Sequence, residues 1–182
     1  MELTQAIRER RTVLRFNDTP VQRQLLIDIL NDAVWAPNHG MREPWRFVEI
    51  KRETIEPMCR LIADWYQKNN RYTEEQIERW YETVIRVPAY LVVVAKKSDD
   101  LKIWEEDYAA VCCLIQNIQL LGWERGVGMV WATNDFIDCD EYREFLKVKS
   151  DEKIVGVLNM GFFDREPKPR PRTPAEKKLT SL

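Results

Sequence analysis

Two clusters of arginine lie near opposite ends of the 182-residue chain. The first is Arg10-Arg11-Thr12, and the second surrounds Arg172 in the proline-rich segment KPRPRTP at 168–174. Arginine offers a planar fork of donors that matches phosphate oxygens, and it keeps its charge at any working pH. Because the net charge is only -2, these clusters are not part of a generally basic surface. Together they favour a site for a phosphate monoester, with two solvated charge runs as the plain alternative.

The composition argues against several other kinds of function. Apolar residues make up 45% and charged residues 32% of the chain, as is usual for a globular domain with a full core. A nearly balanced charge disfavours nucleic acid as the main partner, because that binding needs a basic face. No apolar run approaches the roughly 20 residues of a membrane span. The first residues also lack the apolar stretch of a signal peptide, so we expect no membrane partner and a cytoplasmic location.

The cysteines do not indicate a metal centre. The four of them form no Cys-x-x-Cys pair, and the chain has one histidine, so no metal site is predicted. Cys112 and Cys113 fall inside an apolar helical run, and we expect both thiols to be buried.

No side chain stands out as a catalyst. There is no Gly-x-Ser-x-Gly motif, and any triad would depend on His39, which lies in a loop where a binding role is also open. Walker and Rossmann phosphate loops are absent as well. Glu105, Glu106 and Asp107 lie near the start of a predicted helix, where carboxylates favour the helix dipole, so we expect them to be structural.

Hydrophobic spacing predicts the elements that must position these residues. Helices are predicted at 2–10, 22–33, 53–86 with a break near 69–70, 101–125 and 138–147. Strands are predicted at 46–51, 90–95, 126–132 and 153–163, and the continuous run at 90–95 is typical of burial on both faces. Four strands separated by helices indicate a mixed α/β or α+β sandwich with one central sheet. No linker divides the chain, so residues 1–182 are expected to form one domain with an extended tail.

Several segments, taken in order, resemble the nitroreductase family of flavoproteins. They are Arg10-Arg11-Thr12, APNH at 36–39 leading to EPWRF at 43–47, PAYLVVVA at 88–95, GVGMVW at 126–131, IVG at 154–156 with Gly161, and PRTPAE at 171–176. Each segment is weak alone, but the ordered set covers nearly the whole chain. The sequence looks most like the small, minimal branch of NAD(P)H nitroreductases.

This resemblance implies a dimeric α+β sandwich, with a central, mainly antiparallel sheet flanked by helices and one FMN at each of two sites between the subunits. Arg10, Arg11 and Thr12 would meet the FMN phosphate and ribityl chain, and Arg172 would complete the phosphate site. Further cofactor contacts are implied for Asn38 and His39, usually from the partner subunit, for Trp35, and for Trp131, Ala132 and Thr133 along the isoalloxazine edge. Contacts with the nicotinamide are implied for the end of the long helix, at Leu121, Gly122, Trp123, Glu124, Arg125 and Gly126.

Two positions depart from the family pattern. Leu14 stands where family members often place a basic residue, and Arg15 follows it. Glu43 replaces the glutamine that precedes Pro-Trp, and we expect its carboxylate either to approach the flavin or to face solvent.

The implied activity is that of an FMN-dependent oxidoreductase. It would transfer hydride from NADH or NADPH through the flavin to a nitroaromatic, quinone or similar flat acceptor by a ping-pong mechanism. The flavin carries this chemistry, so no catalytic side chain is implied. Residues 53–86 are the expected helical insert near the active site, and the tail at 164–182 is expected to dock on the partner subunit. Two alternatives remain open, a flavin-binding or interaction protein with little turnover and a dehalogenase or biosynthetic oxidase of the same superfamily.

Overall fold

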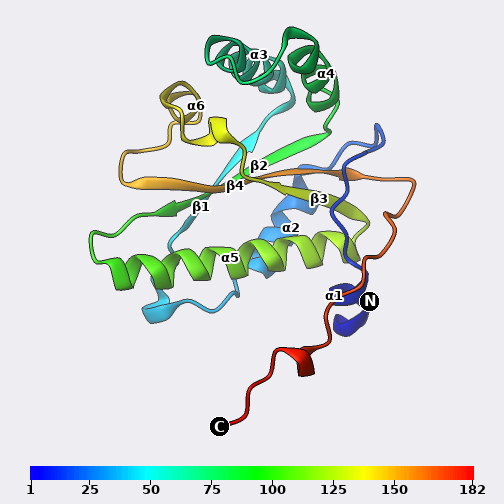
Figure 1. The fold of residues 1–182 in the computed structure, drawn as a ribbon, viewed down its shortest axis with the longest axis vertical. Coiled ribbons are helices and arrows are strands. Elements are labelled where there is room, and N and C mark those ends of the chain that lie inside the picture. The colour runs from blue at the N-terminus through cyan, green and yellow to red at the C-terminus, as the bar shows by residue number, and fades with distance from the viewer.

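A single four-stranded sheet organises the computed structural model, which describes residues 1–182 (Figure 1). Its strands are β1 (Trp45–Ile50), β2 (Ala89–Lys96), β3 (Val127–Ala132) and β4 (Glu152–Phe162). They lie in the order β1-β2-β4-β3, and every neighbouring pair is antiparallel. The expected α+β sandwich with a mainly antiparallel sheet is therefore confirmed.

Helices cover both faces of the sheet. In Figure 1, α2 (Arg23–Ala33) and α5 (Leu101–Glu124) lie below it, whereas α3 (Arg52–Lys68), α4 (Glu74–Val84) and α6 (Asp140–Phe145) lie above it. The first helix, α1 (Leu3–Glu9), lies near the end of α5. The break predicted near 69–70 is confirmed, because Asn70 has a φ of 49° and separates α3 from α4. None of these helices combines the length and the apolarity that crossing a bilayer requires.

Each face of the sheet has its own hydrophobic core, and β2 contributes to both. Leu91, Val93 and Ala95 pack with residues of α2 and α5, whereas the alternate residues of the strand pack with α3 and α6. All six residues at 90–95 are buried, which confirms the prediction for this run. Each fully buried valine or leucine stabilises the fold by about 1.5–3 kcal/mol relative to an exposed one.

The long helix α5 packs its apolar stripe against the sheet. Val111, Leu114 and Ile118 are completely buried, and their spacing places them on one face of the helix. The prediction that both adjacent cysteines are buried is wrong, because Cys112 is only partly buried and Cys113 is exposed. Successive residues of a helix point about 100° apart, and Cys113 lies on the face of α5 that is turned away from the core.

The two chain segments that carry the arginine clusters run past the same end of the sheet. After α1, the chain runs along the outer edge of β3 and past the end of β4, where Val13 N donates to Met129 O (3.2 Å) and Asn17 N donates to Phe162 O (2.8 Å). The tail leaves β4 at the same place, where the Asn17 side chain donates to Asp164 (2.8 Å). It then runs past α1, extended as predicted apart from the short 3₁₀ turn η3 (Ala175–Lys177), and nearly all of it is exposed (Figure 1).

Candidate functional site

Arg10 and Arg11 form a cationic site where α1 ends. Arg10 is the C-cap of α1, and its Nη1 donates to Gln119 Oε1 on α5 (3.3 Å). The Arg11 Nη1 donates to the carbonyls of Arg8 (2.6 Å) and Arg10 (2.9 Å). The Nε atoms of both arginines are buried and have no hydrogen-bond partner. A buried guanidinium N–H without an acceptor is costly, so the pair is poised to receive one.

Arg172 of the tail joins this pair. Its Nη1 donates only to the nearby carbonyls of Arg170 (3.1 Å) and Pro171 (3.4 Å). Burial lowers the pKa of Arg10, and the nearby positive charges of Arg11 and then Arg172 lower it further. None of the three makes a salt bridge with a carboxylate. The structure thus brings the two arginine clusters together and leaves their charge uncompensated.

Beside this cluster, the outer edge of β3 offers main-chain groups. Thr12 forms an isolated bridge with Met129, and the Met129 carbonyl points away from β4 to accept from Val13. Alternate residues of a strand direct their N–H and C=O groups to the same side, so the main chain of Trp131 also points to the outer edge. Val13 approaches closely because residue 128 is glycine, where a Cβ would lie 2.5 Å from the Val13 side chain.

The other predicted flavin residues of this segment lie at the end of β3. The Trp131 indole packs over Gly156, and its Nε1 donates to Val155 O (3.2 Å). Ala132 ends the strand on the opposite face, beside a small apolar cavity of about 40 Å³. Thr133 follows the strand and is exposed. The Trp131 side chain therefore packs against β4, and the groups of this segment that point to the outer edge of the sheet are main-chain groups.

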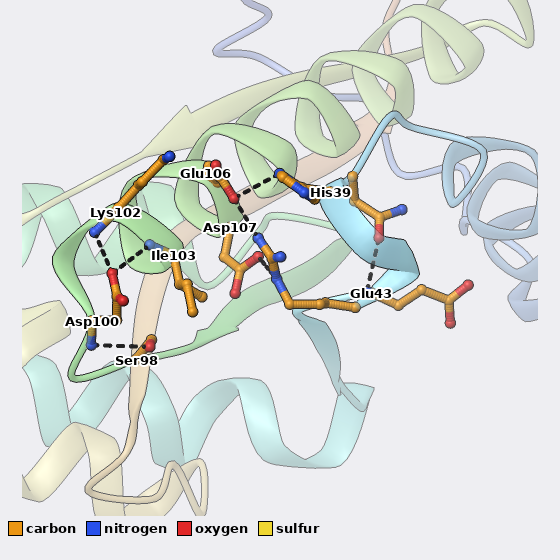
Figure 2. A network of polar contacts seen from close by, with 10 residues as sticks. His39, Glu43, Ser98, Asp100, Lys102, Ile103, Glu106 and Asp107 are labelled. Atoms are coloured by element: carbon orange, nitrogen blue, oxygen red, sulfur yellow. Dashed lines mark hydrogen bonds and ion pairs between the residues drawn. The ribbon is translucent and has the colours of Figure 1, made fainter.

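The loop at 35–44 is fastened to α5 by a polar network (Figure 2). His39 Nδ1 lies 3.0 Å from Glu106 Oε2, and Arg42 Nη2 lies 2.9 Å from the same oxygen. Arg42 Nε donates to Asp107 (2.8 Å), a carboxylate that is largely buried. Within the loop, Asn38 Oδ1 accepts from Glu43 N (3.0 Å), while the Glu43 side chain points away from the network. Glu43 is exposed in the single subunit, and its approach to the flavin stays a prediction.

This network corrects the explanation predicted for the acidic residues of α5. The first turn of the helix holds no acidic residue, so the helix dipole does not account for Glu106 and Asp107. Instead, the Arg42 guanidinium lowers the pKa of Glu106, and His39 lowers it further. Glu106 and Asp107 are structural, as expected, but they act by holding a distant loop. The Glu105 side chain makes no hydrogen bond and is exposed.

The residues implied for nicotinamide binding are mostly occupied by contacts within the subunit. Trp123 stacks on Phe163, with ring centroids 5.3 Å apart, Glu124 binds the N-terminal ammonium (3.0 Å), and Arg125 pairs with Asp32 (2.6 Å). Of the others, Leu121 is partly buried, Gly122 is buried against the Met129 side chain, and Gly126 turns the chain into β3 with a φ of 77°. This group lies next to α1, on the side of the arginine cluster, and its nicotinamide role stays a prediction.

One chain does not bring all the predicted cofactor residues to a single place. Arg10 meets α5 at Gln119, whereas His39 meets it at Glu106. These contacts are about 20 Å apart along the helix, at about 1.5 Å per residue. Trp35 begins the same loop and is 87% exposed. The loop residues Trp35, Asn38 and His39 are therefore separate from the arginine cluster within the subunit.

Sequence reasoning missed the residues that hold the site from beneath. Gln119 is a buried polar residue in an apolar helix stripe, and that interruption was the available signal. Two larger cavities also involve residues outside the prediction. One of about 690 Å³ lies at the ends of β1 and β2, where Arg52 and Arg86 line it. Another, of about 330 Å³, is lined by Leu14, Arg15 and Arg86 beside the end of α4.

Comparison with known proteins agrees with this architecture. The sequence model of the nitroreductase family matches residues 7–162. A Bacillus subtilis (strain 168) protein named "Putative NAD(P)H nitroreductase YfhC" is 33% identical over 182 residues, which cover 99% of this chain and 94% of the relative.

Solved structures show the same fold. A nitroreductase-like family protein from Bacillus cereus superposes with a TM-score of 0.87 at 34% identity, covering 100% of this chain and 96% of the other. An iodotyrosine deiodinase solved with FMN and 3-iodo-L-tyrosine has a TM-score of 0.74 at 22% identity, covering 95% and 96% of the two chains. The latter likeness shows the fold alone. From the family match and the full-length relative, the chain belongs to the nitroreductase family, as its ordered motifs indicated.

Proposed function

We propose that this protein is an FMN-dependent oxidoreductase that works as a homodimer and uses NADH or NADPH as its reductant. Membership of the nitroreductase family supports an oxidoreductase, and FMN is present in the related deiodinase structure. The observation that carries the proposal is the convergence of Arg10, Arg11 and Arg172 without a carboxylate.

The residues of this cluster fit the phosphate of FMN. A phosphate carries up to two negative charges and accepts several hydrogen bonds, which matches three guanidinium groups and two buried Nε–H donors without partners. The like charges of Arg10, Arg11 and Arg172 repel one another until an anion binds between them. Thr12 follows directly, and its hydroxyl is close enough in sequence to serve the ribityl chain.

The edge of β3 suits the ring system. From the arginine cluster, the strand leads along its outer edge to Trp131 and Thr133, whose main-chain donors and acceptors are directed away from β4. A flat ring needs an apolar slot with a few polar groups at its rim. FMN, when bound here, supplies the capacity to take up a hydride and to pass it on. We infer that the protein itself binds, orients and encloses the reactants.

A second copy of the chain completes the site in this proposal. Trp35 is 87% exposed and Met41 is 76% exposed, although both are apolar residues. On α1 only Ala6 is buried, so Leu3 and Ile7 also face outward. Contiguous exposed apolar patches mark interaction surfaces, and we infer that these side chains become part of one when two copies meet. The extended tail at 164–182 buries little in its own subunit and would dock on the partner.

The acceptor is a nitroaromatic, a quinone or a similarly flat molecule. Reductant and acceptor would occupy the same face of the ring in turn, which predicts ping-pong kinetics with parallel lines in double-reciprocal plots. The helical segment at 53–86, which forms α3 and α4, would act as the insert that selects the acceptor. Intersecting lines would contradict the shared binding place.

The visible absorption spectrum of the purified protein tests the proposal directly. We expect a yellow protein with a flavin spectrum that bleaches when NADPH or NADH is added without oxygen, and that recovers when a quinone is supplied. The particle mass in solution should be twice the chain mass of 21.7 kDa. A colourless protein that takes up no FMN in excess would refute the proposal.

Reductive deiodination is the second candidate. It is favoured by the likeness to the iodotyrosine deiodinase, whose structure holds 3-iodo-L-tyrosine. Release of iodide from that compound by the reduced protein would support this candidate, whereas bleaching and quinone reduction without iodide release would exclude it. A protein that binds flavin but reduces no acceptor would instead be a flavin-binding or interaction protein.

A further inference from the structure

Three polar or charged residues of the chain are buried, and the side chain of each accepts a hydrogen bond from an arginine. Asp107 is 6% exposed and Glu152 is 8% exposed, and these two carboxylates form salt bridges with their arginines. Gln119 is 7% exposed, and its Oε1 accepts from Arg10 Nη1 (3.3 Å). Gln119 is therefore the one buried partner of an arginine that carries no charge.

The difference between an amide and a carboxylate decides what the arginine can still bind. A carboxylate that holds a guanidinium also cancels its charge, whereas an amide oxygen fixes the direction of the group and leaves the charge in place. An anion near Arg42 or Arg46 would meet the carboxylate of the salt bridge as well. An anion near Arg10 meets a full positive charge.

The other arginines of the cluster follow the same rule. Arg11 Nη1 donates to the main-chain carbonyls of Arg8 (2.6 Å) and Arg10 (2.9 Å). Arg172 Nη1 likewise donates to main-chain carbonyls. All three guanidinium groups are thus oriented by uncharged oxygen atoms, and Gln119 supplies the one acceptor among them that belongs to a side chain.

Gln119 lies on the face of α5 that is turned to the inside of the subunit. Ile115, Ile118 and Trp123 are neighbours at helical spacing on this face, and all three are buried. Arg10 ends α1 as its C-cap, so its main chain is fixed by that helix and its side chain by Gln119. The Arg10 Nε stays buried without an acceptor, and this donor is the one left for an anion.

We propose that Gln119 is a positioning residue for the phosphate of FMN, because it orients the Arg10 guanidinium through an uncharged acceptor and leaves the charge of the cluster free for the anion. The inference rests on the proposed function, since it requires that the arginine cluster binds FMN through its phosphate. Gln119 itself acts through Arg10. A carboxylate at position 119 would hold Arg10 more strongly and would weaken the binding of the phosphate.

Gln119→Glu is the principal test, with Gln116→Glu as its matched control. Gln116 is exposed on the same helix and its side chain makes no hydrogen bond, so the control changes the net charge by the same amount. Dilution of the flavin-loaded full chain releases flavin, whose fluorescence gives the Kd for FMN and for riboflavin, which lacks the phosphate. We expect Gln119→Glu to raise the Kd for FMN about ten- to a hundredfold and to leave that for riboflavin within about twofold of wild type. Gln116→Glu should leave both values unchanged.

Gln119→Met separates orientation from charge. Methionine has a similar length but offers no comparable acceptor, so Arg10 keeps its charge and loses its fixed direction. We expect the Kd for FMN to rise by only about two- to tenfold, the equivalent of one ordinary hydrogen bond, with the Kd for riboflavin unchanged. In a protein that already carries Arg10→Ala, neither substitution of Gln119 should weaken FMN binding further, because the group through which Gln119 acts is gone.

Three results would overturn the inference and leave the flavoenzyme intact. The first is a Gln119→Glu protein that binds FMN as tightly as the wild type. The second is an equal loss of affinity for FMN and riboflavin, which would mean that Gln119 acts on the fold of the subunit. If Gln119→Glu does not fold, Gln119→Met decides, and an unchanged Kd for FMN is the third. A wild-type protein that binds no flavin would overturn the proposed function and the inference together.

Discussion

Arg10→Ala should weaken FMN binding without destabilising the flavin-free protein. The Arg10 guanidinium has one bond, from Nη1 to Gln119, and a buried Nε without a partner, so its donors are available to an anion. A hydrogen bond to a charged group contributes about 1.5–3 kcal/mol. Its loss corresponds to an increase of about ten- to a hundredfold in the Kd for FMN.

The flavin-free Arg10→Ala protein, in contrast, should be as stable as the flavin-free wild type or slightly more stable. Arg10 lies near Arg11 and Arg172, and this repulsion is not offset by any carboxylate when no anion is bound. Removing one of three like charges should therefore leave the unfolding temperature of the flavin-free protein unchanged or slightly higher. Saturating FMN should stabilise the wild type more than the variant, because a ligand that binds only the folded state adds about 2.7 kcal/mol at 100 times its Kd.

The assay is the quenching of FMN fluorescence on titration with protein from which the flavin has been removed. Arg8→Ala is the control, because Arg8 is exposed on the same helix and its side chain makes no hydrogen bond. Arg10→Lys keeps the charge but loses the planar guanidinium donors, so its Kd for FMN should lie between those of the wild type and Arg10→Ala. An Arg10→Ala protein with the wild-type Kd would refute the placement of the phosphate.

Three further predictions address the tail, an ion pair and a close contact. Arg172→Ala should raise the Kd for FMN by about tenfold or more, because it removes a second charge-assisted contact. Glu152→Gln should lower the free energy of unfolding at pH 7 by about 1.5–3 kcal/mol, since Glu152 accepts two hydrogen bonds from Arg46. Arg46 lowers the pKa of Glu152, so this contribution is present above the ordinary glutamate range and vanishes as the pH falls through the lower folded value. Gly156→Ala should cost about 1–3 kcal/mol, because its Cβ would lie 2.1 Å from the Trp131 Nε1 and the indole would have to move.

Each of these has a measurement that can contradict it. Arg170→Ala is the control for the tail, and an equal effect of both substitutions would mean that general tail charge matters rather than Arg172. Urea unfolding of wild type and Glu152→Gln at several pH values should show the difference shrinking below about pH 4. A constant difference would exclude ionisation as its cause. The unfolding temperature of Gly156→Ala should be lower than that of the wild type. An equal unfolding temperature would contradict the prediction and show that the indole has room to shift.

The sequence by itself determined the order and type of the elements. The apolar run at 90–95 and the helical stripe of α5 are local patterns, and a residue's periodic neighbours decide which side of the element it faces. Arg10, Arg11 and Gly128 also occur along the chain in the order of the family motifs. These features depend on residues only a few positions apart, so they are readable without the fold.

Only the tertiary structure decided which distant residues meet. Arg42 pairs with Glu106 and Asp107 across 64 and 65 positions, and nothing local to either segment announces that contact. The arginines of the two chain ends share a site only because the segment after α1 and the tail after β4 cross the same end of the sheet. Electrostatic contacts of this kind depend on distance in space, which sequence separation does not give. For that reason the helix-dipole explanation of Glu106 and Asp107 was wrong, although a structural role was expected correctly.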